Sequence, residues 1–168
     1  MGYRYVSEAY NVSNAEKQVP IGAEAQLSEM EVQRYDSGAE GDWVLRYVFN
    51  DAAAITQGDC IMMDTDYASF DGIISTGTVI RQRVLGFAIG PIAAGEYGWV
   101  CKRGDCLAKS ADGAILQGEE LVSHSSGHVD ARVVDDTAAT DELDSVIAVA
   151  LENDGATAAT FRVKADIP

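Results

Sequence analysis

The feature that most constrains this chain is a series of short apolar runs of strand length, separated by turn signals. The first is Trp43-Val-Leu-Arg-Tyr-Val-Phe, which is rich in β-branched and aromatic side chains. Further runs lie at residues 60–63, 73–74, 78–80, 84–89, 98–102, 114–116, 120–123, 128–134, 146–151 and 159–164. Pairs such as Asp71-Gly72 and Asp154-Gly155 between the runs are typical of tight turns. The pattern therefore predicts an all-β barrel or sandwich.

Two of the apolar runs match in character at an offset of 62 residues, namely Val84-Leu-Gly-Phe-Ala-Ile and Val146-Ile-Ala-Val-Ala-Leu. The flanking segments that follow this offset approximately are 58–61 with 118–121, and 97–101 with 159–163. These matches predict two related β units, at about residues 58–104 and 118–165. Two units can cover strand edges that one leaves open, which favours one barrel-like core. The alternative is chance similarity between short apolar strands.

Residues 1–40 differ from the rest of the chain, because their hydrophobic periodicity is weak. The sequence therefore predicts an N-terminal arm at 1–40 and a β-domain at 41–168. Aromatic side chains give a large contact area at low entropic cost, so we expect the arm to bind a neighbouring subunit. The residues expected to make this contact are Tyr3, Tyr5, Val6 and Tyr10. The alternative is that the segment packs as a strand or ragged end on its own domain.

The charge of the chain argues against nucleic acid as a partner. Twelve Lys and Arg residues oppose 27 Asp and Glu residues, which gives a formal net charge of −15. Phosphate backbones bind chiefly through neutralising cations, so an acidic surface repels them. The N-terminus lacks the apolar core of a signal peptide, and no run approaches the roughly 20 apolar residues of a spanning helix. We expect a soluble protein, made in a cytoplasm, that binds neither nucleic acid nor membranes.

The polar residues that could support chemistry fall in predicted turns. His124 and His128 flank a short Ser-Ser-Gly segment, but the chain has no G-x-S-x-G nucleophile elbow, so a polar hairpin turn is the simpler interpretation. A calcium loop is also disfavoured, because the spacing departs from the EF-hand pattern and lacks its closing Glu. The acidic residues concerned are Asp64, Asp66 and Asp71. We expect no enzymatic activity.

The three cysteines, Cys60, Cys101 and Cys106, are an odd number and do not form a small disulfide framework. Cys101 and Cys106 with the two histidines could be imagined as a zinc site, but a pair five residues apart and a pair four apart are weak signals. Buried or half-buried free thiols are the expected state. The sequence predicts no metal site and no cofactor.

Four segments are distinctive when taken together. They are Tyr47-Val-Phe-Asn-Asp-Ala-Ala-Ala-Ile-Thr-Gln-Gly-Asp, Val84-Leu-Gly-Phe-Ala, Ile92-Ala-Ala-Gly-Glu-Tyr-Gly-Trp-Val and Val146-Ile-Ala-Val-Ala-Leu-Glu. Together they resemble the small capsid decoration, or cement, proteins of tailed bacteriophages. The resemblance covers roughly residues 42–164. Residues 1–40 and the acidic stretch 135–144, which is expected to be a solvated loop or a turn of helix, match nothing in it.

This resemblance implies a structural virion protein that binds the outer surface of a phage capsid and stabilises contacts between major capsid subunits. It also implies a homotrimer whose partner is the major capsid protein. Many identical contacts act together on a shell, so modest affinity at each site is sufficient. The alternative function is a carbohydrate-binding β module on a virion surface, which requires an aromatic platform along a groove.

Overall fold

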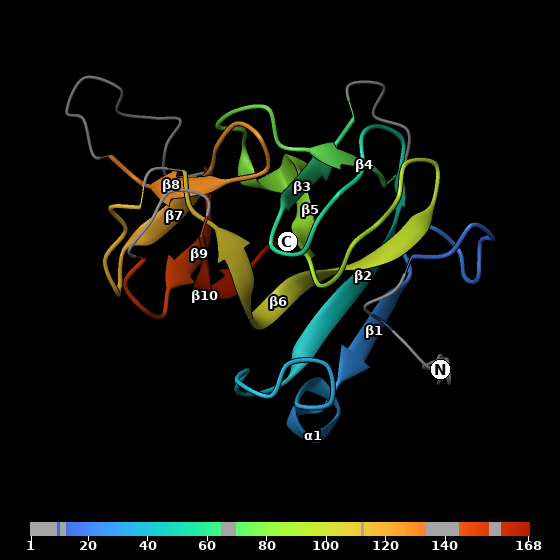
Figure 1. Ribbon diagram of the computed structural model, residues 1–168, viewed down its shortest axis with the longest axis horizontal. Coiled ribbons are helices and arrows are strands. Elements are labelled where there is room, and N and C mark those ends of the chain that lie inside the picture. Colours follow the sequence, from blue (N-terminus) through green and yellow to red (C-terminus); the bar gives the residue numbers. More distant parts are fainter. Residues whose placement is uncertain (1–9, 11–12, 65–69, 112, 134–144, 155–158) are drawn as a thin grey trace.

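The computed structural model of the chain is nearly all β. It describes residues 10, 13–64, 70–111, 113–133, 145–154 and 159–168. Ten strands form one continuous sheet (Figure 1). They are β1 (Glu24–Leu27), β2 (Trp43–Asn50), β3 (Cys60–Met63), β4 (Asp71–Ile74), β5 (Val84–Ala88), β6 (Tyr97–Lys109), β7 (Glu120–Ser123), β8 (Val129–Ala131), β9 (Val146–Ala150) and β10 (Thr160–Asp166). Within this described part, the helices α1 (Glu29–Val32) and η1 (Arg81–Arg83) are far too short to span a membrane.

The first half of the sheet closes into a five-stranded ring, which we call barrel 1. Its strand order is β2, β4, β3, β5 and β6, and β6 pairs back to β2. β2 runs parallel to β4 through Phe49 and Asp71, whereas the other neighbours in the ring are antiparallel. Closure of the ring pairs the strand edges with one another, apart from one part of β2. That part of β2 pairs with β1, which runs antiparallel to it.

The second half of the sheet forms barrel 2, and the long strand β6 belongs to both rings. Residues 97–103 of β6 pair with β2, whereas residues 103–109 pair with β10. The order continues through β9, β7 and β8, and a parallel bridge between Ser110 and Val129 brings β8 back to the end of β6. Figure 1 shows the two rings side by side with β6 crossing between them.

The strands of the two barrels pair in the same register. Cys60 and Ile61 face Phe87 and Gly86, and sixty residues later Glu120 and Leu121 face Val149 and Ala148. The same hydrogen bond is made in the turn before β3 and in the turn before β7. Gly58 N donates to Ala88 O, and Gly118 N donates to Ala150 O, both at 2.9 Å. The closing contact repeats as well, since Asp51 N donates to Gly72 O and Ala111 N to Val129 O. Two copies of one five-strand pattern therefore share β6.

A β-bulge occurs at the same place in each barrel, and the residue at the bulge is buried. Between β3 and β5 the register skips Leu85, and between β7 and β9 it skips Ile147. Both side chains are fully buried. The interior cluster of barrel 1 consists of Val48, Ile55, Ile61, Leu85, Ala88, Ile92 and Val100. The residues at matching positions of barrel 2 are Ala108, Ile115, Leu121, Ile147, Ala150, Asp154 and Val163, and all of them are buried.

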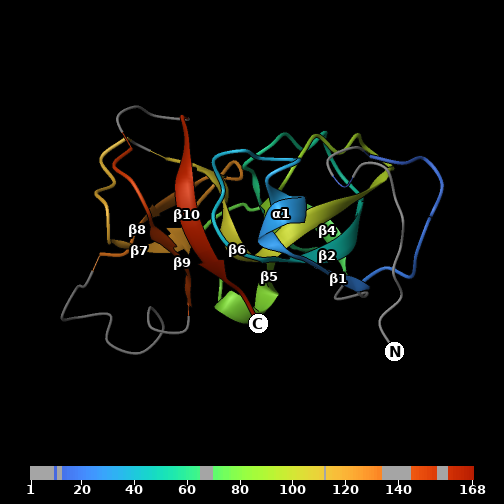
Figure 2. The same cartoon turned by 90° about the horizontal axis from the view of Figure 1, so that it is seen from below.

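Residues 13–40 lie on the outside of barrel 1. β1 pairs with β2 from Glu24 to Leu27, and α1 follows β1 directly (Figure 2). Ser28 and Glu31 form a capping box that starts the helix. The segment contributes buried residues to the large core cluster, including Val19 and Val32. This part of the predicted arm therefore packs on its own domain.

The all-β barrel class predicted from the runs is confirmed. Two predicted runs are wrong as strands, because residues 78–80 and 114–116 are irregular. The run at 98–102 extends to Lys109 because β6 serves both barrels. The predicted division at residue 40, with repeat limits at 58–104 and 118–165, stays a prediction, and the stretch 135–144 lies outside the described residues.

Candidate interaction surface

Of the four residues predicted to bind a partner, Tyr10 is described, and Tyr3, Tyr5 and Val6 lie outside the described residues. Tyr10 is half-buried and packs edge-on against Tyr35 and Trp99, with ring centroids 5.7 Å and 5.2 Å away. Burial, with Tyr35 and Glu31 nearby, raises the pKa of Tyr10. Its ring therefore belongs to the outer wall of barrel 1 in the single chain.

A run of aromatic rings continues from Tyr10 along the outer face of barrel 1. Trp99 contacts Tyr47 at 4.9 Å between centroids, and Tyr47 stacks on Tyr97 at 5.9 Å. Tyr97 contacts Phe49 in turn. Burial raises the pKa of Tyr47, whose hydroxyl accepts a hydrogen bond from Gln18 N. Tyr47 and Trp99 are buried under residues 13–40, so the middle of this run offers no flat surface on which a sugar could stack.

The turn between β7 and β8 rests on barrel 1. Gly127 O accepts a hydrogen bond from Cys60 N at 2.6 Å, and Gly127 N donates to Ser75 O at 3.0 Å. The hydroxyl of Ser125 lies 3.2 Å from Nδ1 of His124, on the exposed side of this turn. A shallow cleft of about 190 Å³ reaches His124, but Ser125 does not line it. The arrangement is the polar hairpin turn that the sequence predicts.

The candidate metal ligands are not brought together in the described part of the chain. No group of three His, Cys, Asp or Glu side chains forms there. Cys101 and Cys106 are buried, whereas the two histidines lie on the β7–β8 turn. Asp66 lies outside the described residues. Partial burial, together with Asp51 and Asp64, raises the pKa of Asp71, because like charges there disfavour ionisation.

All three cysteines are free thiols buried in the core, as predicted. Burial raises the pKa of Cys60 to about 12. It also raises the pKa of Cys106, with further contributions from Cys101 and Asp105. Thiols are reactive as thiolates, so these side chains serve as core packing.

A partly buried ionic network joins the segment before β2 to β6 and β10. Arg162 of β10 donates to Asp105 Oδ1 at 2.9 Å and to Asp36 Oδ1 at 2.6 Å. The second oxygen of Asp105 accepts a hydrogen bond from Glu40 N, and its backbone carbonyl accepts one from Trp43 Nε1. Burial acts to lower the pKa of Arg162, but the two carboxylates outweigh it and raise the pKa. The network is structural, since each charge is paired inside the chain.

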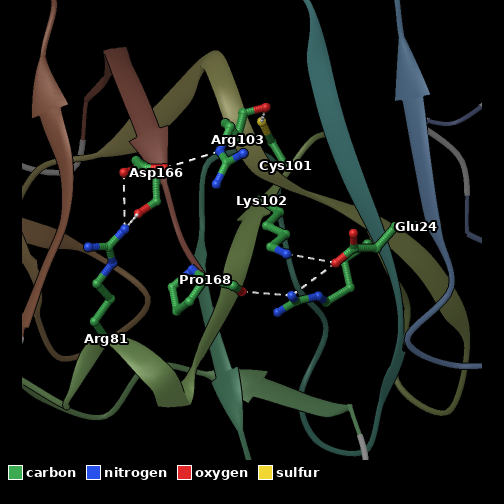
Figure 3. Close-up of polar contacts among 8 residues, drawn as sticks. Glu24, Arg81, Cys101, Lys102, Arg103, Asp166 and Pro168 are labelled. Atoms are coloured by element: carbon green, nitrogen blue, oxygen red, sulfur yellow. Dashed lines mark hydrogen bonds and ion pairs between the residues drawn. The ribbon is translucent and has the colours of Figure 1, made fainter.

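A second ionic group lies where β1, β2, β6 and β10 come together with η1 (Figure 3). We call it the cationic cluster, and it comprises Arg46, Arg81, Lys102 and Arg103, which contact the carboxylates of Glu24 and Asp166. The four cations and the two carboxylates that they contact come from four strands and a helix, so no local sequence motif predicts the cluster. One sequence feature bears on this cluster, namely that the chain has few basic residues, 12 Lys and Arg against 27 Asp and Glu.

The described fold is a pair of β-barrels that share one strand, and the ion pairs and aromatic contacts given above are made within the chain. A family model described as phage cement protein matches residues 38–165. The chain therefore belongs to the phage cement protein family, and it is a structural component of a virion.

Solved structures give a second comparison. The N base of head fiber gp8.5 in bacteriophage phi29 superposes with a TM-score of 0.51 at 9% sequence identity. The match covers 73% of this chain and 92% of that one, and it shows a shared fold. No curated protein matches the sequence.

Proposed function

We propose that the chain binds the outer surface of a phage capsid and stabilises contacts between major capsid subunits. The match of residues 38–165 to the phage cement family is the observation that carries this proposal. The two rings support it, because ring closure in barrel 1 and the pairing of β6 with β10 cover most strand edges of the described residues. The protein would be made in the host cytoplasm and added to the capsid exterior.

The direct test uses capsids of the phage that encodes the chain, assembled without it. The purified protein is added, and binding is followed by co-sedimentation over a range of concentrations. We expect saturation at a fixed number of copies per capsid and a higher temperature of capsid disruption. Capsids that sediment without the protein at saturating concentration would contradict the proposal.

We further propose that the protein is a homotrimer. Light scattering should then give a solution mass three times the 17.9 kDa of the chain. A monomer would rule out a preformed trimer. In that case a glycan array becomes the next test, because the carbohydrate-binding alternative does not need an oligomer.

The arm residues Tyr3, Tyr5, Val6 and Tyr10 remain the proposed partner contacts. The double variant Tyr3→Ala/Tyr5→Ala should weaken capsid binding and leave thermal stability unchanged. Tyr10→Ala is the matched comparison, and it should lower stability as well, because its ring packs on Trp99. Wild-type binding by the double variant would remove the arm from the contact.

A further inference from the structure

The cationic cluster stands out because the chain is otherwise acidic. Four of the 12 Lys and Arg residues meet at one place, although 27 carboxylate side chains are spread over the sequence. These four cations contact two carboxylates, so cations outnumber the carboxylates that they contact, and Arg46 also donates to Pro168 O at 2.8 Å. A local excess of this sign attracts anionic groups from outside the chain.

Each carboxylate of the cluster is held between two cations. Glu24 Oε1 lies 2.8 Å from Lys102 Nζ and 3.1 Å from Arg46 Nη2. Asp166 uses both of its oxygens, with Oδ2 at 3.0 Å from Arg81 Nη2 and Oδ1 at 3.1 Å from Arg103 Nε. The Asp166 side is therefore a two-arginine clamp, in which one nitrogen of each guanidinium group contacts one oxygen of the carboxylate (Figure 3).

The two halves of the cluster differ in access. The side chains of Arg46 and Lys102 are 8% and 15% exposed, so Glu24 closes an inner, structural half. In the outer half, Asp166 is 62% exposed and Arg103 is 58% exposed. Arg81 is 34% exposed. A partner can reach the outer half and compete with Asp166 for the two guanidinium groups.

We infer that Arg81 and Arg103 form a docking point for carboxylates on an acidic protein surface, and that Asp166 occupies it in the free chain. A protein carboxylate fits better than a nucleic-acid backbone, because the total charge of −15 repels an extended polyanion. The inference rests on the proposed function, and it names the chemistry of the capsid surface that the chain meets.

The test measures capsid affinity by co-sedimentation for variants with opposite expected signs. The pair Arg81→Glu/Arg103→Glu should weaken binding by about tenfold or more, since two charge-assisted contacts become repulsive. Asp166→Asn empties the clamp and should tighten binding by about threefold, roughly the worth of one exposed ion pair. The double variant Lys17→Glu/Arg34→Glu is the control, because it makes the same total charge change at two exposed cations outside the cluster and should bind like wild type.

The outcomes separate the two proposals. If wild-type protein does not bind capsids, the proposed function fails and this inference fails with it. If wild type binds and the reversed pair binds equally well, the docking point is wrong while the function stands. Should the reversed pair fold poorly by circular dichroism, Asp166→Asn decides alone, and unchanged or weaker binding overturns the inference. Binding of Asp166→Asn to duplex DNA but no gain on capsids would overturn it in favour of a phosphate site.

Discussion

The two barrels share a backbone pattern, but their outer faces are made of different residues. In barrel 1 the facing pair on β2 and β6 is Tyr47 and Trp99, both buried under residues 13–40. At the matching place in barrel 2, β6 and β10 present Leu107 and Arg162, both partly exposed to solvent. The same difference occurs on β5 and β9, because Phe87 of barrel 1 is buried and Val149, at the matching position of barrel 2, is exposed.

The comparison distinguishes residues that fill the interior of a ring from residues that face its surroundings. Inside each ring the matching positions stay buried, because a small barrel is filled by its own side chains. Outside, the residues follow whatever covers the ring: Tyr47 and Trp99 pack under the N-terminal segment, whereas Arg162 pairs with the carboxylate of Asp36 from the same segment. The interior pattern therefore identifies the fold, and the exterior pattern identifies the neighbours.

The largest expected effects come from truncating the two bulge residues. Leu85→Ala and Ile147→Ala each remove a fully buried side chain, so each should lower the free energy of unfolding by about 2–5 kcal/mol. Both tryptophans lie in barrel 1 strands, so urea unfolding followed by fluorescence reports barrel 1, and circular dichroism reports both barrels. Because β6 is shared, we expect one transition by both probes. Two separate transitions, with Ile147→Ala moving only one, would show that the barrels are independent.

The next effect concerns the polar outer face of barrel 2. Arg162→Met should lower the free energy of unfolding by about 2–4 kcal/mol, because Asp105 is then left buried without its cation. The matched control is Lys164→Met on the same strand, an exposed side chain, where the change should stay within about 0.5 kcal/mol. Equal stability of Arg162→Met and wild type in thermal melts would show that the network adds nothing.

The bulge itself distinguishes the two barrels on a smaller scale. Gly86 has φ 154°, and a Cβ there would lie 2.6 Å from the carbonyl oxygen of Cys101. Gly86→Ala should therefore destabilise the protein by at least about 1 kcal/mol. Barrel 2 already has Ala148 at the matching position, and Ala148→Gly should cost about 0.5–1 kcal/mol. If Gly86→Ala is neutral by urea titration, the bulge of barrel 1 tolerates alanine as that of barrel 2 does, and this position does not distinguish the two barrels.

The smallest expected effect is a pH dependence of the contact between β1 and barrel 1. Burial acts to raise the pKa of Glu24, but hydrogen bonds from Lys102 and Arg46 outweigh it and lower the pKa below 4.5. The contribution to stability is therefore present above pH 4.5 and is lost as pH falls through the folded value. It should stay below about 1 kcal/mol, since the side chain is 44% exposed. Glu24→Gln should flatten this part of the stability profile, and an unchanged acid limb would exclude Glu24 as its source.

The sequence was informative where residues repeat locally. Val84-Leu-Gly-Phe-Ala-Ile and Val146-Ile-Ala-Val-Ala-Leu stand out because β5 and β9 carry the bulge and bury most of their side chains. The match between the two strands that open the rings was harder to recognise, although the first of them was predicted as a strand. Phe49 corresponds to Lys109, and Tyr47 to Leu107, so the outer residues of β2 and of the second half of β6 share little chemistry.

The candidate surface was less predictable than the fold. Unequal connections shift the offset between matching strands from 57 residues for β4 and β8 to 63 for β6 and β10, which hides the full repeat. β1 escaped notice because it is four residues long and only Leu27 in it is buried. Charge clusters such as that at Arg81, Arg103 and Asp166 depend on contacts 63 or 85 residues apart, which no local pattern contains.

The shared strand also sets an order of events during synthesis on the ribosome. Barrel 1 has all its strands once residue 103 has emerged, so it can close while the rest of the chain is still being made. The next residues, 105–109, then extend from it as an unpaired edge until β10, more than fifty residues later, arrives to pair with them. An exposed edge is where nascent chains stick to one another, so messages truncated before β10 should yield aggregates. Pairing with β10 is therefore the step that protects this edge from association between chains.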